Sequence, residues 1–305
     1  MKHIKYFPVL FVFFLLLSCN DSILQPEVEP GDGLNIQIGS RILYSENDID
    51  YYDHSAHYFY FKKSFGDWLR DYRNAKFWIT RDGNVIFEGL LSDNGACCVN
   101  SDSLLIYDTF NLPSFVLKLG NRWQQYASDT VRADGRENAS FLNELKERGL
   151  FYRGLECTVH SVRITGVNEV VVSYIITNSD PWGYYFLDPD KIPVDHISNL
   201  DRCLSFRDFE QQTVHYAIPY YDSTWIHNNG WENEWLTLIE PGMEQAYTTK
   251  YQLTGESDIL KPGKYWMRMI VPGLSHQISK PEERFLENGR IWLGQMELFQ
   301  KIEIE

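Results

Sequence analysis

The chain has 305 residues with 42 acidic residues against 28 Lys and Arg, which gives a formal net charge of −14 at pH 7. An acidic chain without a basic stripe is repelled by phosphate backbones, so we expect no nucleic acid partner. Aromatic residues make up 15% of the chain and fall in short segments bounded by Gly, Pro, Asn and Asp. This pattern favours a mainly β protein, and the length is sufficient for two domains.

Residues 1–18 have the three parts of a signal peptide: a basic start, an apolar run and a small residue before a cleavage point. The apolar run over residues 6–17 is shorter than the roughly 20 residues that a membrane-spanning helix needs. Leu16-Leu17-Ser18-Cys19 resembles the lipobox of Gram-negative envelope lipoproteins. The resemblance implies that residues 1–18 are removed and that Cys19 is acylated, which makes the lipid bilayer a partner. An ordinary secretory signal with a chance cysteine is the alternative.

Residues 19–33 follow as the lipidated cysteine and a flexible tether. Their acidic, Pro- and Gly-rich sequence cannot bury a core. We therefore expect a protein of the cell envelope that is anchored by lipid at the outer membrane, on its periplasmic face or at the cell surface.

Residues 34–150 are predicted to form a mixed domain of β-strands and two short helices. Asp82-Gly83 between apolar runs predicts a hairpin over residues 77–87. One helix is expected over residues 65–72 from its i, i+3, i+4, i+7 apolar spacing, and a second over residues 138–149, capped by Asn138 and ended by Gly149. The other expected strands are 35–43, 57–61, 103–107 and 115–119.

Residues 151–305 are predicted to be wholly β. The expected strands are 155–164, 169–177, 184–187, 213–218, 235–239, 246–253, 264–271 and 291–304, separated by turn signals. The segments EVVVSYIITNSD, IEPGMEQAYTTKYQL and LKPGKYWMRMIV resemble the later strands of bacterial immunoglobulin-like domains. That resemblance implies an immunoglobulin-like β-sandwich. Taken whole, the chain resembles envelope lipoproteins of the Bacteroidota, and this resemblance supplies no role.

Five cysteines are present, and lipidation would use Cys19. Cys97, Cys98, Cys157 and Cys203 then remain in an exported chain, where disulfides can form. Cys157–Cys203 is the favoured candidate disulfide, and free buried thiols are the alternative.

Several short patterns are compatible with chemistry but are better explained structurally. Asp53, His54 and His57 have metal-ligand side chains, but the odd spacing of the histidines would turn their rings to opposite faces of a strand. The same argument separates Cys157 from His160. The stretch Asp188–Asp195 begins like a calcium loop but departs from the pattern at Ile192 and Pro193. Nucleophile elbows, zinc-protease helices and phosphate loops are absent from the sequence. We therefore predict no catalytic residue, no metal and no cofactor.

The strongest candidate for binding is an aromatic stretch over residues 218–235, IPYYDSTWIHNNGWENEW. Its rings would suit a glycan or a protein partner, or else they pack the core. The candidate ligand-binding residues are Tyr220, Tyr221, Trp225, Trp231 and Trp235. The preferred function is thus a non-enzymatic envelope lipoprotein that presents a recognition or adhesion surface. The alternatives are a carbohydrate-active hydrolase with unrecognised carboxylates and a structural accessory of an outer-membrane complex.

Overall fold

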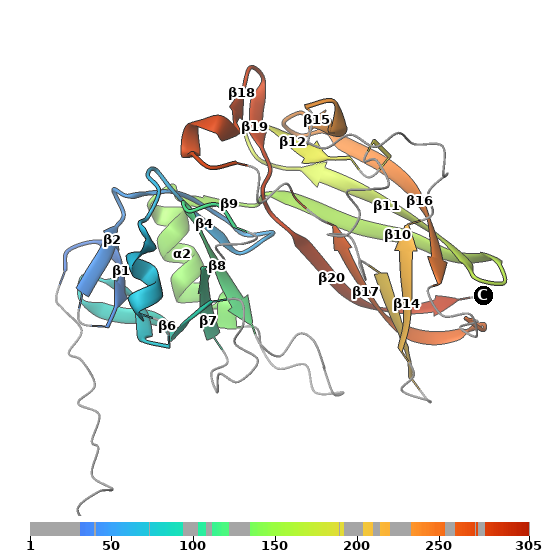
Figure 1. The fold of residues 1–305 in the computed structure, drawn as a ribbon, viewed down its shortest axis with the longest axis horizontal. Coiled ribbons are helices and arrows are strands. Elements are labelled where there is room, and N and C mark those ends of the chain that lie inside the picture. Colours follow the sequence, from blue (N-terminus) through green and yellow to red (C-terminus); the bar gives the residue numbers. More distant parts are fainter. Residues whose placement is uncertain are drawn as a thin grey trace, which may run out of the picture.

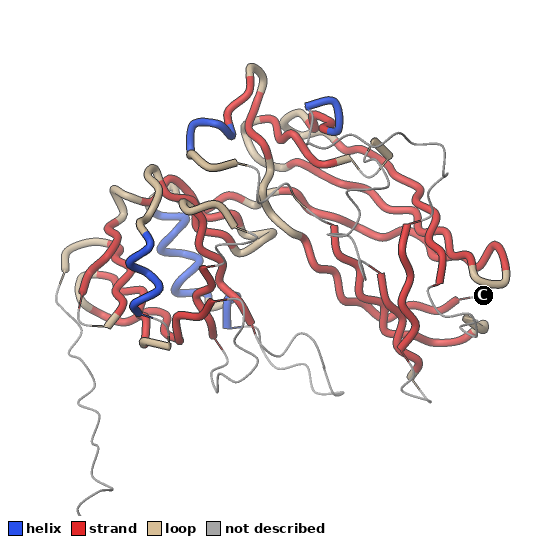
Figure 2. Tube along the Cα trace, viewed as in Figure 1, coloured by secondary structure: helices blue, strands red, loops and turns tan. Residues whose placement is uncertain are grey.

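The computed structural model (Figure 1) describes residues 31–39, 41–72, 74–93, 103–107, 112–121, 135–188, 190–191, 204–209, 214–219, 233–253, 260–271, 273 and 278–304. Strands dominate these residues, with a few short helical segments (Figure 2). The protein is therefore mainly β, as the sequence predicts. The expected signal peptide, Cys19 and most of the tether lie outside the described residues.

A nine-stranded sheet occupies the first half of the chain, in the order β2-β1-β5-β6-β7-β8-β4-β3-β9. Neighbouring strands are antiparallel except in the pairs β6/β7 and β3/β9. Helix α2 (Ala139–Glu147) packs against β6 and β9 and buries Phe141 and Leu145. The strands are β1 (Leu34–Ile38), β2 (Arg41–Ser45), β3 (Ile49–Asp53), β4 (Tyr58–Phe61), β5 (Lys76–Arg81), β6 (Asn84–Asp93), β7 (Ser103–Tyr107), β8 (Val116–Asn121) and β9 (Phe151–Tyr152).

Local sequence signals explain the best-predicted elements of this half. The β5–β6 hairpin turns at Asp82 and Gly83, whose φ angles are 49° and 78°, as a type I′ turn requires. Asn138 caps α2, because its side-chain oxygen accepts hydrogen bonds from the backbone N–H groups of Ser140 and Phe141 at 2.9 and 3.3 Å. The predicted hairpin and capped helix are thus confirmed.

Other expectations for this half were wrong in detail. The strand expected over residues 35–43 is divided into β1 and β2, because the chain turns at Gly39. The helix expected over residues 65–72 is a 3₁₀ helix, Asp67–Tyr72. Strand β3 was not predicted. Strand β9, which we assigned to the second domain, pairs with β3 and so belongs to the first sheet.

A seven-stranded sheet forms most of the second half, in the order β10-β11-β16-β14-β13-β17-β20. Strand β14 pairs with β13 over residues 214–217 and with β16 over residues 217–219, so it joins two groups of strands. The outer strands β10 and β20 approach each other without pairing. The strands are β10 (Leu155–Gly166), β11 (Glu169–Asn178), β13 (Leu204–Asp208), β14 (Val214–Pro219), β16 (Glu244–Leu253), β17 (Gly263–Val271) and β20 (Met296–Ile304).

A third sheet of four strands has the order β15-β12-β19-β18. These strands are β12 (Gly183–Leu187), β15 (Leu236–Ile239), β18 (Phe285–Leu286) and β19 (Gly289–Ile291). Strand β19 pairs in parallel with β12. The segment after β19 then runs past the first half of the molecule before it enters β20 (Figure 1).

Buried polar groups join the two halves. The carboxylate of Asp53, at the end of β3, accepts a hydrogen bond of 2.9 Å from the indole Nε1 of Trp292, and neither residue is exposed. The carboxylate of Asp180 accepts hydrogen bonds from the backbone N–H groups of Arg153 and Gly154 at 3.0 and 2.9 Å. The hydroxyl of Tyr184 donates a third, at 2.8 Å. These directional contacts fix how the first sheet meets the second half.

Two arginines add stacked contacts to the same interface. Arg284 is 1% exposed, pairs with Asp50 and lies 5.2 Å from the ring centroid of Tyr51. The guanidinium of Arg290, on β19, lies 5.0 Å from the same ring of Tyr51. Cation–π contacts gain strength when they are desolvated, as they are here for Arg284. These contacts pack side chains of the first sheet against the second half.

Candidate functional site

Most of the predicted binding residues lie outside the described part of the chain. This holds for Tyr220, Tyr221, Trp225, Trp231 and the lipidation residue Cys19. Trp235 is described, and only 7% of its surface is exposed. This burial fits the core-packing alternative for Trp235.

The structure gives no disulfide at Cys157, which carries a free thiol on β10. Its expected partner Cys203 lies outside the described residues, as do Cys97 and Cys98. Cys157 packs against the core, and burial raises the pKa of its thiol to about 12. A thiol in this state is not an activated nucleophile. The sequence also predicts that Cys157 and His160 face opposite sides of the strand, which agrees with an unreactive thiol.

The histidine pair of the first half is arranged differently from the expectation. Residues 54–57 form a turn between β3 and β4, so the alternation of a strand does not apply to His54 and His57. Their ring centroids are 5.3 Å apart. Glu137, which precedes α2, places its Oε1 at 2.9 Å from Nε2 of His54 and 3.9 Å from Nε2 of His57. The argument that the two rings point to opposite faces was therefore wrong.

Asp53 shapes the turn that carries these histidines. Its carboxylate Oδ1 accepts hydrogen bonds from the hydroxyl of Ser55 at 2.6 Å and from the backbone N–H of Ala56 at 3.3 Å. Burial raises the pKa of Asp53 to about 6, although the hydrogen bonds from Ser55, Ala56 and Trp292 act in the opposite direction. The buried carboxylate thus connects the histidine turn to the second half through Trp292.

A row of aromatic rings lies on the outer face of the seven-stranded sheet. Along β17, Tyr265, Met267 and Met269 are buried, so Trp266 between them faces outward. The ring of Trp266 is stacked with those of Phe209 and Phe299, with centroid distances of 5.2 and 4.9 Å and interplanar angles of 12°. Phe299 is 37% exposed. We call Phe209, Trp266 and Phe299 the aromatic row.

Basic side chains surround the aromatic row. The Nζ of Lys301 lies 4.5 Å from the ring centroid of Trp266. Strand register places Arg207 opposite Trp266, and Arg268 opposite Phe299. The Nε atom of Arg207 is buried and has no hydrogen-bond partner in the structure. Lys264 and the exposed Glu303, which are opposite each other, lie on the same face, so the border of the row is mainly basic but also carries a carboxylate.

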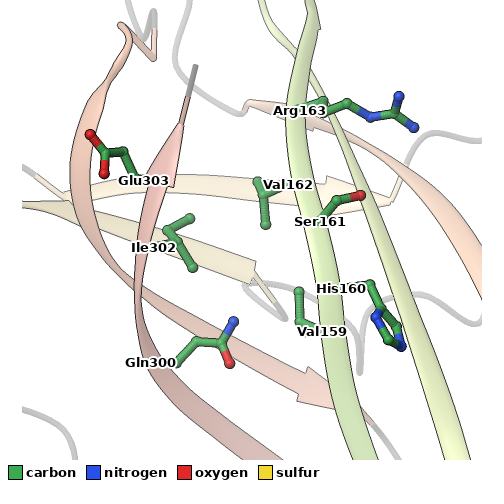
Figure 3. Close-up of a pocket in the computed structure, with 8 residues that line it drawn as sticks. All are labelled: Val159, His160, Ser161, Val162, Arg163, Gln300, Ile302 and Glu303. Atoms are coloured by element: carbon green, nitrogen blue, oxygen red, sulfur yellow. The ribbon is translucent and has the colours of Figure 1, made fainter.

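A pocket of about 400 Å³ lies where the edges of β10 and β20 approach (Figure 3). Val159, Val162 and Ile302 point into it, whereas His160 and Arg163 point away (Figure 3). The side chains that point into it are thus apolar, and polar residues, among them Ser161, Gln300 and Glu303, also line it.

The stretch compared with a calcium loop forms a hydrogen-bonded turn over its described part. Asp188 is 6% exposed and accepts hydrogen bonds from the backbone N–H of Asp190 at 3.0 Å and the hydroxyl of Thr237 at 2.5 Å. Asp195 lies outside the described residues. Asp188 and Asp190 thus belong to a hydrogen-bonded turn rather than to a calcium loop.

Comparisons with known proteins identify no family for the chain. It matches no protein-family model, and a search of curated proteins finds no significant match. Within the part of the chain that the structure covers, no helix is both long enough and apolar enough to cross a membrane.

Proposed function

We propose that this chain is a non-enzymatic, lipid-anchored protein of the cell envelope that binds an anionic glycan. The aromatic row and its basic border carry this proposal. The lipobox-like sequence at Cys19 supplies the anchor, and residues 19–33 supply the tether. The two packed halves then hold the binding face at a distance from the bilayer.

The chemistry of the row suits a sugar chain with acidic groups. Aromatic faces pack against the apolar C–H faces of sugar rings. The three rings are stacked on one another, so a sugar would meet their edges and the outer faces at the two ends of the stack. Arg207 and Lys301 beside the stacked rings can pair with carboxylate or sulfate groups. Exposed aromatic surface on a single face is a feature of interaction sites rather than of ordinary solvent-facing strands.

The strand order supports an immunoglobulin-like β-sandwich as the frame of this face. Divided at β14, the seven-stranded sheet gives the groups β10-β11-β16-β14 and β13-β17-β20. These correspond to the ABED and CFG sheets of constant-type immunoglobulin domains. The row would then lie across the CFG sheet, which is a rigid support for a binding surface.

The carboxylates of the interface do not favour the hydrolase alternative. Asp53 and Asp180 influence each other electrostatically, but they are 0% and 6% exposed. A glycosidase needs two carboxylates that flank a bound sugar. Here both groups are occupied by hydrogen bonds that hold backbone and side chains in place.

The proposal is tested with full-length protein in detergent, by biolayer interferometry on immobilised polygalacturonate and on neutral dextran. We expect binding to polygalacturonate alone, and a loss of at least about tenfold in affinity for the double variant W266A/F299A. Met243→Ala is the matched control, because Met243 is 55% exposed and lies in a turn away from the row. Urea unfolding of each variant checks that the fold is retained.

Two results would contradict this function. If W266A/F299A and M243A bind polygalacturonate with equal affinity, the aromatic row does not take part in glycan binding. Retention of an outer-membrane protein, with no glycan binding, would favour the accessory alternative. The anchor is tested separately, because Cys19→Ala should release the protein from the membrane fraction.

A further inference from the structure

We propose that His54, His57 and Glu137 form a binding site for a divalent transition-metal ion, with zinc as the best fit. Their ligand atoms all lie within 4.8 Å of one another. The site is independent of the proposed glycan surface, because it lies in the first half of the chain.

The donor set selects the class of metal. Two imidazole nitrogens and one carboxylate are the protein ligands of zinc sites that keep a fourth position open. Calcium and magnesium prefer oxygen ligands throughout, so two histidines argue against them. Ligand atoms held at about 2.05 Å by a tetrahedral zinc lie about 3.3 Å apart. The distances of 2.9 and 3.9 Å from Glu137 to the two histidines bracket this value.

A hydrogen bond with Tyr52 is compatible with the metal-binding tautomer of His57. The hydroxyl of Tyr52 lies 2.8 Å from Nδ1 of His57. In the tautomer in which Nδ1–H donates to this hydroxyl, Nε2 carries the ring's lone pair, and Nε2 lies 3.9 Å from Oε1 of Glu137. Such outer contacts orient the imidazole and raise its basicity as a ligand.

The backbone of Leu119 holds the two parts of the site together. Its N–H donates to the carbonyl oxygen of His57 at 2.8 Å, and its carbonyl oxygen accepts a hydrogen bond from Nη1 of Arg136 at 3.4 Å. Arg136 is 6% exposed and directly precedes Glu137. The turn with the histidines and the segment with the carboxylate are therefore fixed to the same residue of β8.

The histidine turn is also held in an uncommon conformation. His57 has a φ of 55°, a region that residues other than glycine adopt rarely. Conformations of this kind persist where the surroundings determine them, and they are frequent at ligand sites. In this protein the surroundings are the hydrogen bonds from Ser55 and Ala56 to Asp53.

Solvent reaches the site from one side. The side chains of His54 and Glu137 are 28% and 49% exposed, whereas that of His57 is 12% exposed. A metal ion held here would have its fourth position open to water or to a donor from another molecule. We therefore infer an exchangeable site rather than a closed structural one.

The experiment is titration of EDTA-stripped full-length protein with zinc chloride in a calorimeter, followed by cobalt substitution and visible spectroscopy. We expect wild type to bind one zinc ion at this site. The zinc affinity should be at least about tenfold lower in E137Q and in H54A. His160→Ala is the control, since His160 is an exposed histidine on β10. Tetrahedral cobalt bands should appear in wild type and H160A and be lost in E137Q.

Each outcome decides the proposal. E137Q replaces a half-exposed side chain, so its melting temperature in EDTA should equal that of wild type and its result stands even if H54A fails to fold. Zinc affinities of E137Q and H54A that equal the affinity of H160A would overturn the site. So would the absence of saturation by about 1 mM zinc.

Discussion

Gly154 offers the sharpest test of the packing between the histidine turn and the second half. Its φ is +74°, and a Cβ at this position would lie 2.1 Å from Oδ1 of Asp53 and 2.3 Å from Oγ of Ser55. Gly154→Ala should therefore cost about 1 kcal/mol for the left-handed backbone. The displacement of Asp53 should cost about 3 kcal/mol more, because it breaks hydrogen bonds to a buried carboxylate.

Gly149→Ala is the matched control for this prediction. Gly149 has a φ of +67°, but a Cβ there would have no atom within 4 Å. G149A should show the backbone cost alone, about 1 kcal/mol, against about 4 kcal/mol for G154A. Urea unfolding followed by tryptophan fluorescence measures both, with the slope of the transition held in common. A difference below about 0.5 kcal/mol between the two variants would refute the close contact of Gly154 with Asp53.

Two further changes probe buried groups. Trp292→Phe keeps an aromatic ring but removes the indole N–H that donates to Asp53. It should lower the free energy of unfolding by about 2 kcal/mol in the same urea assay. A loss below about 0.5 kcal/mol would contradict the role of the indole N–H. Since the pKa of Cys157 is raised to about 12, its thiol stays protonated below that pH, and native alkylation by iodoacetamide should accelerate about tenfold per pH unit from pH 8 to pH 10. Mass spectrometry of the Cys157 peptide measures this rate, and equal labelling of native and urea-unfolded protein at pH 8 would contradict its burial.

Elements with a strong local signal could be predicted from the sequence. The turn at Asp82-Gly83 and the cap at Asn138 each depend on residues within a few positions, so they were correct. Strand β13 is not predicted, because LSFRD is short and only its pairing with β14 is local; the residues that pair with it on β17 come about 60 positions later. Strand pairing over such distances leaves little trace in a local window.

The candidate sites also divide into features with a local sequence signal and features that depend on residues far apart in the chain. The aromatic pattern around the two histidines predicts a strand, whereas they lie in a turn. The spacing of Asp53 and Ser55 is the local signal that favours this hydrogen-bonded turn. Glu137 lies 83 positions from His54, so no local pattern connects them. Trp266 was detectable, because it occupies a polar-side position in the alternation of KYWMRMIV.

Asp53 couples the metal site to the interface between the halves. One of its carboxylate oxygens accepts the hydrogen bonds of Ser55 and Ala56 that set the histidine turn, and the other accepts the hydrogen bond of Trp292. A metal ion that stabilises the turn also favours the position of Asp53 in which Trp292 is bonded. Because linkage is reciprocal, a zinc ion that favours this position of Asp53 implies that Trp292→Phe, which removes the hydrogen bond to Asp53, lowers the zinc affinity of the proposed site.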